Sequence, residues 1–191
     1  MASGRYRSRF RNTRKGVQLM NNWKRYSIQR AALLLVACSL FSSVAAQDRA
    51  AILAGSELLR VVPTGFYFQG LSAPTQMRNS AAARWEKNRH VIAGLVDTSG
   101  YSSDVRAKYE GFLITDSDIT LEGKSLKTGA YGFGFSNDGK LNIMDLAGDQ
   151  ILSVSTAKDT KLKRPRPLMM SQDGERVRLY SGRDYALIAA K

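Results

Sequence analysis

Cysteine and histidine are almost absent from this chain, which has one of each in 191 residues, Cys38 and His90. A single cysteine cannot form a disulfide within the chain. One histidine without a nearby cysteine cannot supply the usual set of zinc ligands. The Gly-x-Ser-x-Gly turn that carries the serine of many hydrolases is also missing. We therefore expect no cofactor, no metal site and no complete catalytic group in residues 47–191.

Acidic residues are missing from the first 46 positions, which hold nine of the 29 lysines and arginines. The chain has 16 acidic residues and a formal net charge of +13, a value that suggests a nucleic-acid partner. Without the first 46 positions, 20 basic and 16 acidic residues remain, a net charge of +4. The strong basicity belongs to the N-terminal segment, and we expect no nucleic acid as a partner.

This N-terminal segment has the order of an export signal. Its basic part ends at Arg30, and an uncharged stretch, 31–47, follows and contains small residues at its end. The order predicts a signal peptide cleaved between Ala46 and Gln47, with cleavage after Ala45 as the alternative. Serines interrupt the stretch, which falls short of the ~20 strongly apolar residues of a membrane-spanning helix.

Two further alternatives stay open for this leader, 1–46. Met20 is an internal start that would shorten the leader to an ordinary length. The run Leu35-Val36-Ala37-Cys38 resembles the bacterial lipobox, in which the cysteine is lipidated and anchors the protein to the envelope. Seven apolar residues precede Cys38, and the chain after it stays apolar where a lipoprotein usually has a polar tether. Cleavage at Ala46 is therefore the expectation.

After the leader, apolar and polar residues alternate with a period of two, which is typical of strands. In 131–135 the alternation places Tyr131, Phe133 and Phe135 on one face and two glycines on the other. We expect these rings to lie in the core rather than to form a stacking platform for sugars or bases. Val91–Val96 is apolar on both faces, as in a central strand. The other segments that predict strands are 66–68, 110–115, 118–122, 141–146, 150–156, 177–180 and 185–188.

Helical periodicity is scarce. It predicts one amphipathic helix over 49–60, ended by Pro63, and two turns of helix over 103–109. Residues 160–167 are expected to form a long loop, because their two prolines cannot lie in a central strand.

Turn signals recur every eight to twelve residues, a spacing typical of β-sandwiches and barrels. We therefore predict one mainly β domain over 47–191. It should be an antiparallel β-sandwich or barrel with one short N-terminal helix after the signal peptide.

The stretch from Asp118 to Tyr131 carries the pattern GK-x-L-xx-G-x-Y, which begins at Gly123, between two expected strands. This element resembles a part of uncharacterised exported bacterial β-domains. The chain after the leader, including 95–101, also resembles exported proteins of soil bacteria. The resemblance implies an exported β-domain, and it implies no activity, because none is assigned to such domains.

Asp97 and His90 carry the alternative of an enzyme, a hydrolase of unfamiliar type. Asp97 opens Asp-Thr-Ser-Gly, which resembles the Asp-Thr-Gly loop of aspartic proteases, but Ser99 separates the threonine from the glycine. His90 follows Asn88-Arg89 and is expected in an exposed turn. The alternative requires Asp97 to meet His90 or another carboxylate in a concave pocket.

A basic loop is the candidate binding element. It places four positive charges in seven residues, at Lys161, Lys163, Arg164 and Arg166. Such a loop can bind phosphate, an anionic lipid head group or an acidic polymer. The other interpretation is a solvated loop whose charges keep the edge of a sheet from pairing.

These features predict an exported, non-catalytic β-domain in the periplasm or cell envelope. It would bind a partner, either an envelope protein or a polymer, or contribute structure. The alternatives are the hydrolase with Asp97 or His90, and an envelope subunit anchored to the membrane through a lipid on Cys38.

Overall fold

The structure is a computed structural model, and it describes residues 49–85 and 88–191. The signal peptide, its cleavage between Ala46 and Gln47, the internal start at Met20 and the lipobox cysteine Cys38 lie outside the described residues. Neither helix in the described part is long and apolar enough to cross a membrane.

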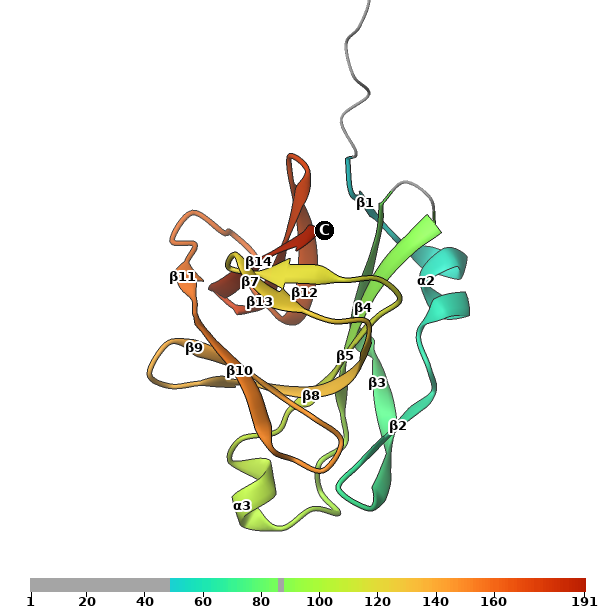
Figure 1. Cartoon of the computed structure of the whole chain (residues 1–191), viewed down its shortest axis with the longest axis vertical. Coiled ribbons are helices and arrows are strands. Elements are labelled where there is room, and N and C mark those ends of the chain that lie inside the picture. Colours follow the sequence, from blue (N-terminus) through green and yellow to red (C-terminus); the bar gives the residue numbers. More distant parts are fainter. Residues whose placement is uncertain (1–48, 86–87) are drawn as a thin grey trace, which may run out of the picture. The chain divides into compact units, whose positions relative to one another are not determined.

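The described residues form fourteen strands and two short helices (Figure 1). The elements in chain order are β1 (Ala51–Ile52), α2 (Gly55–Val61), β2 (Gly65–Phe68), β3 (Leu71–Trp85), β4 (Arg89–Val96), α3 (Ser103–Arg106), β5 (Gly111–Thr115), β6 (Ile119–Leu121), β7 (Lys124–Leu126), β8 (Gly129–Ser136), β9 (Lys140–Met144), β10 (Gln150–Ser155), β11 (Ala157–Lys158), β12 (Arg166–Asp173), β13 (Arg176–Gly182) and β14 (Asp184–Ala190).

The strands build two antiparallel sheets, which confirms the predicted mainly β fold and is consistent with a β-sandwich. The first sheet has eight strands in the order β1-β3-β4-β5-β8-β9-β10, with β2 paired to β3. The second has six strands in the order β12-β13-β14-β6-β7, with β11 paired to β14. In Figure 1 the orange and red strands of the C-terminal part belong mainly to the second sheet.

A hydrophobic core is shared by the two sheets. The first sheet contributes Val91, Leu113 and Phe133, and the second contributes Leu121 and Leu179, all of them fully buried. Tyr131 and Phe135 are partly buried and pack against the same core. The prediction that the aromatic face of 131–135 lies in the core is therefore confirmed, with Phe133 at its centre.

The opposite face of the first sheet is also covered, which agrees with the apolar character of Val91–Val96 on both faces. A second cluster of buried residues joins Phe68 of β2 to Val96, Phe112 and Tyr109. The rings of Phe68 and Tyr109 are stacked with their centroids 3.9 Å apart. Central strands of this sheet are buried on both sides, so they need apolar residues at consecutive positions.

Gly132 and Gly134 bring other parts of the chain directly onto β8. A β-carbon at Gly132 would overlap the ring of Phe68, and one at Gly134 would overlap the carbonyl of Lys108. The glycine face of β8 thus carries the close contacts of the second cluster and of the segment after α3.

The predicted helix over 49–60 is wrong at its beginning. Ala51 and Ile52 form β1, which pairs with β3, and the helix starts at Gly55. Gly55 has a φ of 55°, a left-handed conformation in which a helix cannot continue from the preceding residues. The helix ends at Val61, two residues before Pro63, as expected. The expected helix at 103–109 is shorter, Ser103–Arg106, and Ser102 caps it.

The expected loop over 160–167 is too long by two residues, because β12 begins at Arg166. Pro167 is compatible with this strand because β12 lies at the edge of the second sheet, and its pairing with β13 is irregular after Arg166. The strand β3, Leu71–Trp85, was not predicted, although it joins β1, β2 and β4.

Truncation of Phe133 tests the core. We expect Phe133→Ala to lower the free energy of unfolding by about 3–5 kcal/mol, the range for a fully buried phenylalanine. Tyr67→Ala is the control, because Tyr67 is 57 % exposed, and it should change stability by no more than about 0.5 kcal/mol. Urea unfolding measures both variants. An unchanged midpoint for Phe133→Ala would show that this ring is not a core element.

Candidate anion-binding site

Positive charge is concentrated in the last part of the chain. Residues 157–191 hold nine basic and four acidic residues, whereas residues 47–156 hold eleven basic and twelve acidic residues. The C-terminal segment therefore has a net charge of +5, and the preceding part has a net charge of −1. The whole positive excess of the chain after the leader lies on β11 to β14 and the loop among them.

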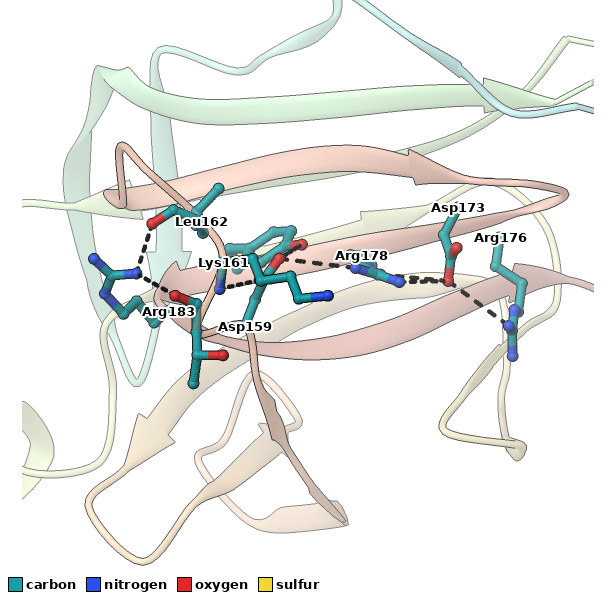
Figure 2. Close-up of polar contacts among 9 residues, drawn as sticks. Asp159, Lys161, Leu162, Asp173, Arg176, Arg178 and Arg183 are labelled. Carbon is teal, nitrogen blue, oxygen red and sulfur yellow. Dashed lines mark hydrogen bonds and ion pairs between the residues drawn. The ribbon is translucent and has the colours of Figure 1, made fainter.

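The basic loop is held to the second sheet by hydrogen bonds at its beginning (Figure 2). A carboxylate oxygen of Asp159 accepts a bond from the backbone N–H of Lys161 at 3.0 Å. The guanidinium of Arg183 donates to the carbonyl oxygens of Leu162 and Thr160. The backbone N–H of Asp159 in turn donates to the carbonyl of Arg183 at 2.9 Å. Arg183 thus holds the backbone at Asp159, Thr160 and Leu162, and none of the loop's four cations is used for this.

The acids near the loop are already paired with other cations. Arg178 lies 3.8 Å from a carboxylate oxygen of Asp159 and 3.3 Å from one of Asp173, and Figure 2 shows it between them. Asp173 also pairs with Arg176 at 3.7 Å. Asp184 lies 3.7 Å from the ammonium of Lys158.

Tyr180 and Tyr185 complete this network on the outer face of the second sheet. The Tyr180 hydroxyl bonds to Asp159 at 3.1 Å, and the guanidinium of Arg178 lies 4.8 Å from the centroid of the Tyr185 ring. Tyr180 is 2 % exposed although its neighbour Leu179 faces the core. Because neighbouring residues of a strand face opposite sides, Tyr180 must be covered on the outer side.

The four predicted cations have no acidic partner in the part of the chain that the structure describes. Lys161, Lys163, Arg164 and Arg166 are exposed, and within residues 49–85 and 88–191 none of them forms an ion pair. The structure thus brings the predicted residues together on a supported loop and leaves their charge uncompensated. Exposed, uncompensated cations on a fixed backbone can attract and hold an anionic group.

The structure does not bring Asp97 and His90 together. His90 lies near the start of β4, and Asp97 follows its end. Seven residues of extended strand separate them by roughly 23 Å, from ~3.3 Å per residue. Asp97 is solvent-exposed, and its carboxylate accepts a bond from the backbone N–H of Ser99, which holds the pKa of Asp97 below its usual value. Asp97 therefore stabilises the turn that follows β4, as aspartates at the ends of many strands do.

His90 was expected in an exposed turn, and this was wrong. It is a residue of β4 opposite Arg84, and its side chain is 15 % exposed. Its Nδ1 lies 3.0 Å from a carboxylate oxygen of Asp116, whose other oxygen accepts a bond from the His90 backbone N–H. A pocket of about 270 Å³ borders His90, and its described lining contains no serine, threonine or cysteine that could act as nucleophile.

The described residues contain no group of three or more histidine, cysteine, aspartate or glutamate side chains that could hold a metal ion. No protein-family model, no curated protein and no solved structure matches the chain.

Sequence reasoning missed two features of this region. Arg183, which fixes the loop, carries no local signal, because its partners lie more than twenty residues earlier in the chain. The uneven distribution of charge between 47–156 and 157–191 was visible in the sequence and would have indicated the same surface.

Glu110 is a further residue that the sequence did not indicate. It precedes β5, and one carboxylate oxygen accepts a bond from the backbone N–H of Phe135 at 3.2 Å. Burial raises the pKa of Glu110, and the bond from Phe135 opposes this shift only in part. The Glu110 carboxyl group therefore binds its proton more strongly in the folded chain than in the unfolded chain.

Replacement of Glu110 by glutamine tests this environment. A raised folded pKa gives stability that is present at low pH and is lost as the pH rises through that pKa. Glu110→Gln keeps the acceptor for Phe135 and removes the titration. Above the raised pKa the variant should be at least as stable as the unaltered chain, and its advantage should disappear in acid. Urea unfolding over a pH series measures this, with the exposed Glu175→Gln as control. A variant that is less stable at neutral pH would contradict the assignment.

Proposed function

We propose that residues 47–191 are an exported, non-catalytic binding domain of the periplasm or cell envelope that holds an acidic polymer through the basic loop. The observation that carries the proposal is the set of four exposed cations, Lys161, Lys163, Arg164 and Arg166, which have no acidic partner among the described residues. The acids that support the loop are engaged by other cations, so the four loop cations are available to an external anion.

A polymer fits this loop better than a single small anion. The four cations lie within six residues, 161–166, and the backbone is restricted by Pro165 inside this run and by Pro167 directly after it. Charges spread along a chain bind repeated charges of a polymer, and several weak contacts then add to one useful affinity. An anionic lipid surface is the second ligand that such a loop could bind.

The hydrolase alternative has less support. Asp97 and His90 lie at opposite ends of β4, and the acid beside His90 is Asp116. A histidine–aspartate pair activates a hydroxyl or thiol nucleophile when one lies within hydrogen-bond reach. The pocket beside His90 offers none among its described residues.

Removal of the loop's charge tests the proposal. We expect the full chain with Lys161→Gln, Lys163→Gln and Arg164→Gln to bind an immobilised acidic polysaccharide at least about tenfold more weakly, a loss of about 1.4 kcal/mol. The matched control replaces three exposed cations elsewhere by glutamine, at Arg49, Arg78 and Lys108. This control should bind the polysaccharide nearly as well as the unaltered chain does. Because the basic leader is common to all variants, a difference between the two triple variants comes from the replaced residues. Binding should also weaken as salt is added. Equal losses in both triple variants would show that net charge, not the loop, determines binding.

Export has its own test. Expression in a bacterium with a secretory system should yield a product that begins at Gln47, or at Ala46 for the alternative cleavage. N-terminal sequencing and mass spectrometry of the envelope fraction check this. An intact leader, or a lipid on Cys38, would replace this part of the proposal by an anchored form.

A further inference from the structure

A pocket with polar residues in its lining lies beside the end of the basic loop. It is a pocket of about 290 Å³ where segments from both sheets meet. Its lining includes Leu95, Thr98, Arg106, Glu110, Pro167 and Ser181. This volume lies just below the range of about 300–1,000 Å³ for small-molecule sites, so one ring rather than a longer unit fits it.

The pocket continues the surface of the basic loop. Pro167 lines it and directly follows Arg166, the last cation of the loop. Arg166 pairs with Gly182 of β13, and the neighbouring Ser181 also lines the pocket. The last cation of the loop is therefore adjacent in the strand to a residue that lines the pocket.

Several polar groups of the pocket have no partner among residues 49–85 and 88–191. The Arg106 guanidinium forms no ion pair or hydrogen bond in the part of the chain that the structure describes, and neither the Thr98 nor the Ser181 hydroxyl has a bond there. Glu110 uses one carboxylate oxygen for the N–H of Phe135, and its other oxygen has no described donor.

The combination of a free cation, a carboxyl group and two hydroxyls favours a ligand rich in hydroxyl groups. A phosphate presents only anionic oxygens to the carboxyl group in the wall and is repelled, whereas a sugar ring with a carboxylate can turn its hydroxyls to Glu110 and its carboxylate to Arg106. Leu95 and Pro167 add apolar surface, against which the C–H face of a sugar ring can pack. A polyphosphate has neither hydroxyls nor such a face.

We propose that this pocket binds one sugar ring of an acidic polysaccharide whose neighbouring carboxylates lie on the basic loop. The proposal rests on the function proposed above and names its ligand class: an acidic polysaccharide, recognised by ring and by charge, rather than any polyanion. The loop supplies attraction, and the pocket supplies selectivity.

Glu110→Gln tests the pocket, because it should change the affinities for two polymers in different directions. We would titrate the full chain with polygalacturonate, whose rings carry carboxylates and hydroxyls, and with polyphosphate, which has charge alone. The variant loses a carboxylate acceptor and a negative charge. We expect it to bind polygalacturonate about three- to tenfold more weakly, and to bind polyphosphate as well as or better than the unaltered chain. Glu175→Gln is the charge-matched control on an exposed turn, and it should weaken neither.

The outcomes separate the two proposals. If Glu110→Gln strengthens polygalacturonate binding, as loss of any negative charge would, the pocket does not hold a sugar ring, although the loop can still bind polymers. If polyphosphate binds more tightly than polygalacturonate to the unaltered chain, the ligand class is also wrong. If the triple loop variant binds both polymers as the unaltered chain does, the proposed function itself is overturned. We also expect Arg106→Gln to weaken the binding of polygalacturonate, as Glu110→Gln does. An unchanged affinity of this variant would contradict the proposal that the pocket binds a sugar ring.

Discussion

Contact on the glycine face of β8 is the constraint on which the core and the position of Glu110 in the pocket depend. With no β-carbon at Gly134, the carbonyl of Lys108 lies directly against the strand. The chain then runs into Glu110, whose N–H bonds to the carbonyl of Phe133 and whose carboxylate accepts the N–H of Phe135. Phe133 is meanwhile buried between the two sheets on the other face. One strand thus holds the core with its aromatic side and positions the segment from α3 to β5 with its glycine side.

The basic loop depends on a different principle, the separation of structural charge from available charge. Asp159 and Asp173 are occupied by Arg178, and Arg183 bonds to backbone carbonyls rather than to an acid. Exposed ion pairs of this kind contribute little to stability on their own. Their effect here is to fix the loop's beginning, so that less conformational entropy is lost when an anion binds to the cations that follow.

Much of the fold was predictable because alternation and two-sided apolar runs reflect burial directly. Val91–Val96 and 131–135 were correct for this reason. The strand β3 was missed because alanines and polar residues fill Leu71–Trp85, and its strand character comes from pairing with three partners. For the site, composition alone indicated the loop's cations. Neither Arg183 nor Glu110 was predictable, since their partners are distant in sequence and are brought near by the sheets.

In the proposed binding mode, charge and selectivity would be carried by different residues, and physical chemistry gives a reason for this division. Exposed cations act over about a Debye length, roughly 8 Å at physiological salt, and attract any polyanion. Discrimination needs short contacts that a wrong ligand cannot satisfy. A partly buried carboxyl group such as Glu110 is suited to this, because it repels an anion placed against it and accepts a hydrogen bond from a hydroxyl. Burial also raises its pKa, so the repulsion strengthens as the pH rises through that pKa. Selectivity against phosphate should therefore increase with pH while attraction by the arginines of the loop stays constant.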